Sequence, residues 1–359
     1  MSLLGIFLPI YVYEITQSLL WVILFFLVWS VAILVFLEIL GKTLFSKISL
    51  KNILILSLGL LMVKYYFLLE GRYNEIFLLY AGILGGIVTV MYWVPYDTLF
   101  TRKFKDGTKH FGRENSKNDI LLKLSGALAP LLGGAIITLY GFSWLFTISV
   151  VLFGVCAVPL LSIIETKPHK HDVASIIKNY VFNPKLKSIT VGYIGEGMES
   201  AIQTTFWAVL MFLSLQNFIA LGFVTTLGLV LSLFTSNLAG KMTDEKGPRL
   251  TQRLGSVGIA FLYIPRIIAN HPVVFYAIDL IDKMTMPFYG IPLISATYEL
   301  AEKFNELDYI IYRELILHVT RVLTLVLIIF ILPKLVTWRL VFLIGTLGAL
   351  LSNKVTRKI

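Results

Sequence analysis

The chain has 359 residues, of which 57% are hydrophobic and 14% are charged, and its mean hydropathy is +0.83. Soluble domains have an apolar share of about 45–50%, so this composition excludes an ordinary soluble domain. Because each membrane-spanning helix takes about 20 apolar residues, about twelve spans fit in the chain and leave only short loops. The apolar runs are about twice as long as the strands of a membrane barrel. The composition therefore predicts an all-α integral membrane protein in a lipid bilayer.

The basic residues gather in every second loop of this arrangement. The formal net charge is +10, from 31 Lys and Arg against 21 Asp and Glu. Of the 31 basic residues, 24 fall in the loops at 41–53, 101–123, 165–188, 239–253, 299–313 and 352–359. By the positive-inside rule, these loops and both termini face the cytoplasm, and we expect a multi-pass protein of the plasma (inner) membrane. The basic charge then reports topology, and we expect no nucleic-acid partner.

The hydropathy pattern predicts the helices in chain order. We expect them at 3–16, 19–40, 52–69, 75–100, 118–140, 143–164, 189–213, 218–238, 253–269, 273–298, 309–332 and 337–352. The longest polar interval is 165–188. It divides the chain into an N-terminal transmembrane bundle at 1–164, a cytoplasmic linker at 165–188 and a C-terminal transmembrane bundle at 189–359.

The two bundles carry signs of duplication. Three residue pairs recur in order at offsets of 197, 200 and 199: Tyr92 and Pro95 as Tyr289 and Pro292, Arg113 and Glu114 as Arg313 and Glu314, and Gly41 and Lys42 as Gly240 and Lys241. With six helices in each half, both copies have the same orientation, and a substrate site is expected between them near the bilayer midplane. With the seventh helix beginning at 189, the same offset would start its counterpart in the first half before Met1. We therefore expect the first helix to be short or truncated.

The loop after the eighth helix carries a motif. Gly240, Asp244, Gly247 and Arg249 fit the pattern G-x-x-x-D-x-x-G-x-R, and with twelve spans, a central linker and paired halves the chain resembles the major facilitator superfamily over nearly its whole length. The resemblance implies two six-helix bundles related by a pseudo-twofold axis and a cytoplasmic gate. It also implies a partner for Asp244 at the start of the fifth helix, for which Arg113 is the candidate. The alternative is that Asp244 only caps a turn.

The fifth helix contains Pro130, Gly133 and Gly134, which resemble the antiporter motif of the same superfamily. Small residues let helices approach closely, and proline bends a helix. We expect a hinge between the halves here. A packing role without antiport is the alternative, because the same residues occur in uptake members of the family.

Ionisable residues inside the spans give the clearest functional signal, since each costs about 2.5–3.5 kcal/mol at a helix centre on insertion scales. Glu196 and Glu199 share one face of the seventh helix, and Asp279, Asp282 and Lys283 lie in the tenth. The superfamily lines its central cavity with the first, fourth, seventh and tenth helices, so the resemblance implies one polar cluster that takes up and releases protons. The alternative is a static ion pair of these acids with Lys283 or Arg321.

Aromatic residues with polar tips lie on the cavity helices. Tyr92, Trp93 and Tyr96 come near the end of the fourth helix and Tyr289 lies in the tenth. Such side chains suit a pocket for an amphipathic substrate. An aromatic belt at the membrane interface is the alternative, and Asp97 is expected to serve a gate or the topology.

The eleventh helix adds further charged residues, Arg313, Glu314, His318 and Arg321. In the superfamily the second and eleventh helices pack together, so the resemblance implies a bridge from Glu38 to Arg313 that closes the cytoplasmic side. A lone histidine is more often a packing residue than a switch, and Arg321 needs an acidic partner.

Two other basic residues lie inside predicted spans, Lys64 in the third helix and Arg266 in the ninth. Long basic side chains reach the interface while their stems stay in the apolar region. We therefore expect both to extend outward.

Enzyme motifs are missing from the sequence. There is no nucleotide-binding loop, no zinc-protease pair and no serine-hydrolase elbow, and His169 and His171 alone would hold a metal weakly. We expect no enzymatic activity, no cofactor and no metal.

These observations together predict a secondary transporter. It moves a small-molecule substrate by alternating access as a monomer, and we expect proton-coupled export of an amphipathic compound. Proton-coupled uptake of a small metabolite is the nearest alternative. A non-transporting sensor or scaffold would be favoured by fixed salt bridges and a closed cavity, and lipid translocation by a lateral opening.

Overall fold

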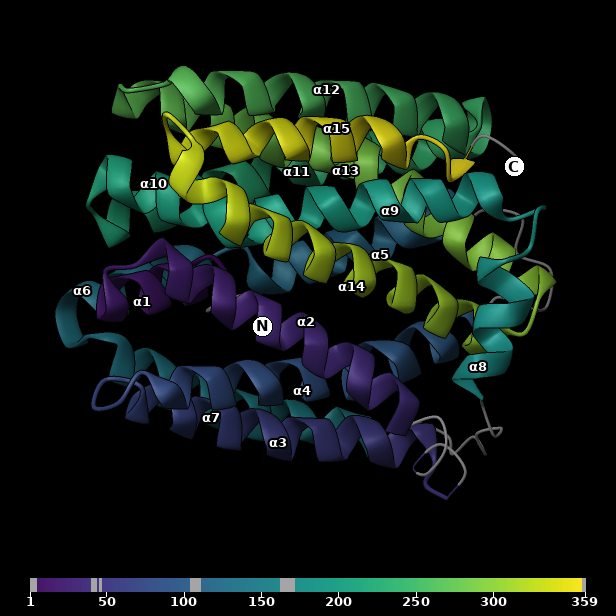
Figure 1. Cartoon of the computed structure of the whole chain (residues 1–359), viewed down its shortest axis with the longest axis horizontal. Helices are drawn as coiled ribbons and strands as arrows, with labels where there is room; N and C mark the ends of the chain where they lie inside the picture. The colour runs from purple at the N-terminus through teal and green to yellow at the C-terminus, as the bar shows by residue number, and fades with distance from the viewer. Residues whose placement is uncertain (1–4, 40–43, 45–46, 104–110, 162–171, 357–359) are drawn as a thin grey trace.

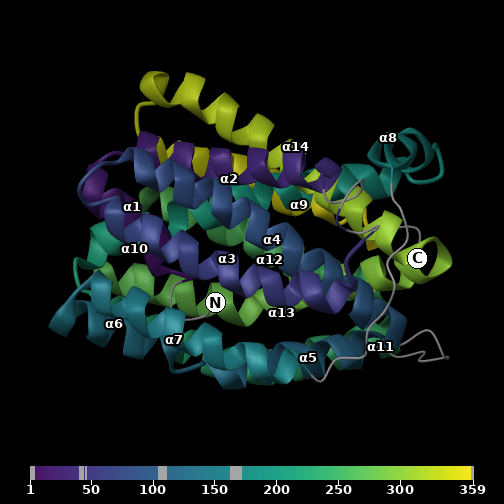
Figure 2. The ribbon, with the colours of Figure 1, turned by 90° about the horizontal axis from the view of Figure 1, so that it is seen from below.

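The structure, a computed structural model, describes residues 5–39, 44, 47–103, 111–161 and 172–356. In this part of the chain the helices run side by side along one long axis (Figure 1), and the view from below shows the same parallel arrangement (Figure 2). Seven helical segments are long and apolar enough to cross a membrane. Together with shorter helices they make up the twelve rods expected from the sequence, so the all-α prediction is confirmed.

The first half of the chain forms six of these rods. They are α1 (Phe7–Thr16), α2 (Leu19–Ile39), α3 (Leu50–Glu70), α4 (Ile76–Lys103), the interrupted rod of α5 (Phe111–Gly126) and α6 (Ala129–Tyr140), and α7 (Phe142–Leu160). The first helix is short, as expected, with 10 residues. The fifth rod begins earlier than predicted because Gly112, Asn115 and Ser116 are buried, and α5 packs there against the second half.

The second half forms the other six rods. The linker holds α8 (Val173–Ile176) and a π-helical turn (Ile177–Val181). The first rod consists of α9 (Lys187–Ile202), a π-helical segment (Gln203–Trp207) and α10 (Ala208–Leu215). The other rods are α11 (Phe218–Lys246), α12 (Pro248–Ile268), α13 (Pro272–Lys303), α14 (Glu306–Ile331) and, after a 3-10 turn (Trp338–Val341), α15 (Phe342–Ser352). Three of these rods extend five or more residues further than predicted: α11 by eight and α13 by five at their ends, and α12 by five at its start.

The two halves repeat a local backbone feature. Gln17 ends α1 and Gln216 ends α10, both in the left-handed conformation with φ of 48° and 47°. In each case the backbone N–H donates to a carbonyl four residues earlier, of Tyr13 or Phe212. Such φ values are uncommon outside glycine, and the two positions are 199 residues apart, which is the offset of the sequence repeats.

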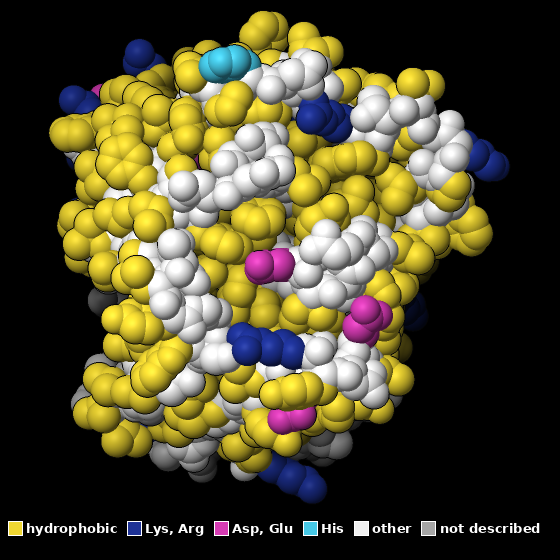
Figure 3. Space-filling model, turned by 90° about the vertical axis from the view of Figure 1, so that its left-hand side faces the viewer, with side chains coloured by type: hydrophobic (Ala, Val, Ile, Leu, Met, Phe, Trp, Pro, Cys, Tyr) yellow, Lys and Arg dark blue, Asp and Glu magenta, His cyan; other side chains and the backbone are white. Residues whose placement is uncertain are grey.

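The ends of the bundle differ in charge. The end that holds α8, from the basic linker, and the C-terminus lies on the right of Figure 1, and we call it the basic end. Figure 3 shows the opposite end, where hydrophobic side chains dominate and only scattered charged groups appear. Many large apolar side chains are exposed along the rods, among them Leu139, Phe234 and Phe330. A lipid environment accounts for this exposure.

Two separate apolar clusters form the core. One contains Phe7, Phe146 and Phe206 and lies toward the end opposite the basic end. The other contains Leu50 and Tyr309 and lies toward the basic end.

Candidate functional site: a central cavity

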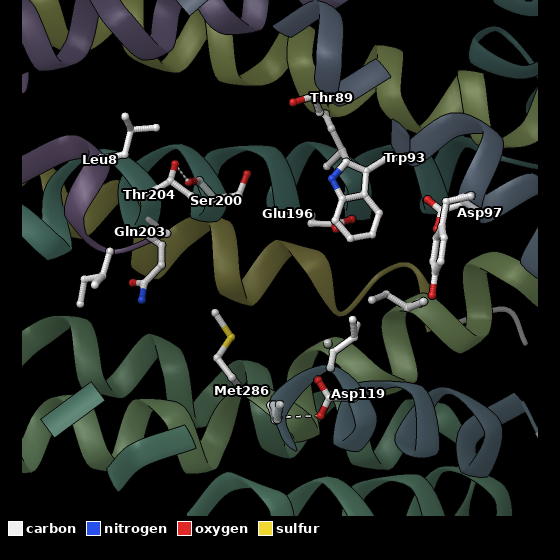
Figure 4. A pocket seen from close by; sticks show the side chains of 18 of the residues that line it. Leu8, Thr89, Trp93, Asp97, Asp119, Glu196, Ser200, Gln203, Thr204 and Met286 are labelled. Carbon is white, nitrogen blue, oxygen red and sulfur yellow. Dashed lines mark hydrogen bonds and ion pairs between the residues drawn. The ribbon is translucent and has the colours of Figure 1, made fainter. Parts of the chain in front are cut away.

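A cavity of about 1030 Å³ lies between the two halves (Figure 4). Its wall draws on both halves of the chain, with residues of α1 to α6 from the first half and of α9, α10, α11, α13 and α14 from the second. In Figure 4, Leu8, Gln203 and Thr204 lie at one end of the cavity, Asp97 lies at the other, and Glu196 lies between them. The helices of the two halves therefore enclose a polar space in the membrane-spanning region.

The structure divides the residues predicted for this cavity. Five line it: Glu196, Lys283, Trp93, Tyr96 and Arg321. Five others are not part of the described wall: Glu199, Asp279, Asp282, Tyr92 and Tyr289. Arg313 and Glu314, which were assigned to the gate, line the cavity as well. Depth along a helix was thus predicted better than the direction of the side chain.

A cluster of four ionisable groups lies on the cavity wall. The Arg313 guanidinium binds the carboxylate of Glu196 on α9 and, at 3.0 Å, the carboxylate of Glu314. His318 Nε2 lies 3.4 Å from the other oxygen of Glu314. One guanidinium therefore serves two carboxylates, with a histidine beside them. We refer to Glu196, Arg313, Glu314 and His318 as the coupling cluster.

This arrangement replaces the predicted bridge between Glu38 and Arg313. The two carboxylates that pair with Arg313 lie in the second half of the chain, on α9 and α14. Glu38 is partly exposed near the end of α2. The prediction of this bridge is wrong because the guanidinium turns into the cavity, where two carboxylates already neutralise it.

A second charged network lies behind the cavity wall, inside the C-terminal bundle. Arg266 Nη2 binds Asp282 Oδ1 at 2.6 Å, and both side chains have no solvent exposure. The Gln203 amide bridges the pair, since its Nε2 donates to Asp282 Oδ2 at 3.1 Å and its Oε1 accepts from Arg266. The Arg266 guanidinium also lies 4.1 Å from the ring centroid of Trp207.

This network corrects two expectations. Arg266 does not extend outward, because Asp282 provides a buried carboxylate on the adjacent helix α13. Asp282 pairs with Arg266, and neither Lys283 nor Arg321 is its partner. The sequence offered a signal for this network that was missed: Tyr263 and Arg266 are three residues apart and therefore share one face of α12.

Glu199 and Asp279 border the same network. The Tyr263 hydroxyl donates to Glu199 Oε1 at 2.8 Å and to Gln203 Oε1 at 3.3 Å. Asp279 accepts a hydrogen bond from Trp207 Nε1 at 2.8 Å and lies 3.8 Å from Lys283 Nζ. Of these residues, Gln203, Trp207 and Lys283 reach the cavity, so they connect the network to the substrate space.

Lys64 also differs from expectation. Its side chain is 5% exposed and lines the cavity, so it does not extend outward. The ammonium lies 4.2 Å from the ring centroid of Trp29 and 5.8 Å from that of Tyr65. Aromatic faces attract a cation through their quadrupole, which explains why this lysine turns inward.

The loop motif makes the contact that the resemblance implied. Asp244 accepts hydrogen bonds from the backbone N–H groups of Gly112 at 2.9 Å and Arg113 at 3.0 Å, at the start of α5. Gly247 has φ of 89° at the junction of α11 and α12, a conformation that glycine tolerates. Arg249 is exposed. A β-carbon on Gly240 would collide with Ser116, so glycine permits the close contact of α11 with α5.

Two more hydrogen bonds join the halves near the basic end. The Tyr298 hydroxyl donates to Asp97 Oδ1 at 2.7 Å, between α13 and α4. Asn115 Nδ2 donates to Ser295 Oγ at 2.9 Å, between α5 and α13. Asp97 thus lies at a junction of the two halves, whereas its hydrogen-bond partner was not predicted from the sequence.

The proline and glycines of the fifth rod contact α11. The rod is interrupted between α5 and α6, with Pro130 in the first turn of α6. A β-carbon on Gly134 would collide with the backbone of Phe218, and one on Gly222 with the backbone of Pro130. Gly133 is buried in the same helix. These residues allow two helices of different halves to touch, which the packing alternative predicts.

A helical membrane bundle with two repeated halves and a polar cavity between them defines a secondary transport protein rather than an enzyme. The sequence profile of the Major Facilitator Superfamily matches residues 1–307, and the chain belongs to this family.

Solved structures share the fold. A bacterial homologue of the iron transporter ferroportin, in an outward-facing state, has a TM-score of 0.67 at 14% identity over 99% of this chain and 95% of that one. The fucose:proton symporter of E. coli has a TM-score of 0.63 at 11% identity over 99% and 93%. No curated protein sequence matched. At these identities the structural likeness extends to the fold alone.

Proposed function

We propose that this transporter moves an amphipathic small molecule across the membrane by alternating access, driven by protons. The observation that carries the proposal is the coupling cluster, which lies on the wall of a central cavity. It places titratable groups where water and substrate can reach them. We place the protein in the plasma membrane as a monomer, with both termini in the cytoplasm, on the distribution of basic residues.

The charges of the cluster explain how it holds a proton. Glu196 and Glu314 together carry two negative charges when ionised, and Arg313 supplies one positive charge. A remaining negative charge in a low-dielectric region is costly. One proton, on a carboxylate or on His318, makes the cluster neutral. In alternating access the cavity meets water on one side of the membrane at a time. The cluster can therefore take up this proton on one side and release it on the other.

The wall of the cavity indicates an amphipathic substrate. Seven aromatic side chains of the described residues line it: Phe26, Trp29, Tyr65, Trp93, Tyr96, Trp207 and Tyr298. Polar groups such as Asn118, Ser200 and Thr204 are placed among them. Pockets with apolar walls and a few polar groups bind molecules that combine an apolar body with a polar group.

The contacts between the halves suit alternating access. Near the basic end, Tyr298 binds Asp97 and Asn115 binds Ser295. At the opposite end, apolar contacts such as Phe7 with Phe218 join α1 to the second half. Each net hydrogen bond is worth only about 0.5–1.5 kcal/mol, so the two bonds near the basic end can break at modest cost. Export was the direction expected from the motif at Pro130. The helix packing at this residue suits export and uptake equally, so the flux assay measures both directions.

The test is flux in proteoliposomes with a panel of labelled amphipathic compounds that carry positive, negative or no charge. We expect at least one compound to move in response to a pH gradient, and the movement to stop when nigericin collapses the gradient. Glu196→Gln and Glu314→Gln should abolish the response to the gradient and retain exchange of labelled for unlabelled compound. Glu299→Gln is the control, because Glu299 pairs with Lys303 away from the cavity.

The outcomes separate the alternatives. Flux that ignores the pH gradient in the wild type, or a gradient response that survives in both cluster variants, contradicts proton coupling by these residues. Absence of flux for every compound in both directions favours the sensor or scaffold. The sign of the response distinguishes export from uptake.

A further inference from the structure

Two cationic side chains of the cavity have no carboxylate partner among the residues that the structure describes. The first is Lys64 on α3, whose ammonium faces the rings of Trp29 and Tyr65. The second is Arg321 on α14, whose Nη2 donates to the Thr204 hydroxyl at 2.9 Å and whose Nε is buried without a hydrogen-bond partner. A cation in an apolar wall without an anion is costly.

The other cations on the cavity wall are already neutralised. Lys123 binds Asp119 at 2.7 Å, Lys283 lies 3.8 Å from Asp279, and Arg313 binds the carboxylates of the coupling cluster. Lys64 and Arg321 therefore differ from the rest, because no described carboxylate lies within ion-pair distance of either, and Glu314 and Glu199 act on Arg321 only from farther away. The missing ion pairs point to a partner that comes from outside the protein.

The two cations are placed to act together. Lys64 belongs to the first half and Arg321 to the second, and both line the same cavity. Each lies about 21–22 Å along its helix from the basic end, at 1.5 Å per residue from Leu50 and Glu306. Thr204, the partner of Arg321, lies at the end of the cavity away from Asp97 (Figure 4). The negative charge of Asp97 is thus remote from Arg321.

We propose that the transported molecule is an organic anion, whose negative group binds between Lys64 and Arg321 and whose apolar body packs on the aromatic wall. This inference rests on the proposed transport function and adds the charge of the substrate. An anion that contacts both halves at once would also draw them together around it. The same two positive charges would repel a metal cation or an organic cation from this part of the cavity.

The test measures binding of three naphthalene probes to the full chain in nanodiscs, by isothermal titration calorimetry against empty nanodiscs. The probes are naphthalene-1-sulfonate, neutral naphthalene-1-sulfonamide and cationic 1-naphthylmethylammonium. The sulfonate stays ionised across the working pH range, so its charge does not vary. We expect the wild type to bind the sulfonate at least about tenfold more tightly than the other two, as a charge-assisted contact requires.

Variants test the two residues separately. Lys64→Gln and Arg321→Gln should each weaken sulfonate binding about tenfold or more and leave sulfonamide binding unchanged. Arg321→Lys, which keeps the charge, should retain most of the preference. The control Lys283→Gln removes a cavity cation that already has Asp279 beside it, and should change sulfonate binding less than either.

The proposal is overturned if the wild type does not prefer the sulfonate, or if the preference survives in both glutamine variants. Binding needs neither flux nor a proton gradient, so the two proposals fail in different ways. A sulfonate preference without pH-driven flux would support the anion site and contradict proton-driven transport. Proton-driven flux of neutral or cationic compounds without a sulfonate preference would support the transport proposal and contradict the anion site.

Discussion

Replacement of Asp282 by asparagine provides a sharp test of the network behind the cavity wall. Asp282 and Arg266 form an ion pair at 2.6 Å with no exposure of either side chain. Asp282→Asn keeps the shape of the side chain and leaves the Arg266 charge uncompensated. Removing one partner of such a pair costs about 3–5 kcal/mol. We expect the free energy of unfolding to fall by about this amount, most of which is the cost of the isolated buried guanidinium.

A double variant distinguishes the pair itself from the cost of breaking it. Arg266→Met with Asp282→Leu removes both charges, and buried ion pairs replaced by apolar residues are often neutral in stability or gain about 1–4 kcal/mol. The loss of the Gln203 contacts offsets part of this gain. We therefore expect the double variant to be more stable than Asp282→Asn alone.

The measurement is reversible unfolding by SDS in mixed micelles, followed by circular dichroism. Asp282→Asn should also retain the response to a pH gradient in whatever fraction of the protein remains folded, since Asp282 lies outside the described wall of the cavity. A cost below about 1 kcal/mol, which is the range of exposed pairs, would refute the reasoning. So would a double variant less stable than the single one.

Three further predictions concern the gate, the contact between halves and the coupling of charges. Asp244→Asn weakens the bonds to the start of α5, and a cysteine placed by Ser295→Cys should react faster with a water-soluble thiol reagent; an unchanged rate contradicts a gate here. Gly134→Val should abolish transport, because the side chain meets the Phe218 backbone, whereas normal flux would exclude close contact as a requirement. Glu196→Gln should tighten sulfonate binding by at most about tenfold. Glu196 pairs with Arg313, which lies about 12 Å along α14 from Arg321, and a charge at that distance contributes about 1.4 kcal/mol at an effective dielectric of 20. Weaker binding in this variant would contradict the predicted sign.

The sequence predicted features that depend on position along the chain. Asp244 and Arg113 were matched through a loop motif, and the structure brings Asp244 to the backbone of Arg113. The helix boundaries agreed within a few residues for most rods because long apolar runs have one stable solution in lipid. The boundaries follow from local patterns, whereas the contact of Asp244 with Arg113 is long-range and was predicted only through the family motif.

Side-chain direction was harder to predict because it depends on neighbours from other helices. Glu199 and Asp282 were predicted to meet in the cavity, yet Tyr263 and Arg266 on α12 bind them inside the C-terminal bundle. Lys64 was expected to extend outward, but the ring of Trp29 on α2 holds it inside. These partners are far apart in sequence, and hydropathy along one helix carries no information about them.

The central claim is that the movement of protons and the movement of substrate are coupled in this transporter. The most direct measurement uses proteoliposomes loaded with the pH dye pyranine and an inward gradient of whichever naphthalene probe binds. Binding of an anion and of a proton to one cavity favour each other, so we predict that the sulfonate acidifies the lumen in the wild type and in Glu299→Gln, but not in Glu196→Gln or Glu314→Gln. Entry of the probe without any change of internal pH in the wild type would contradict the account.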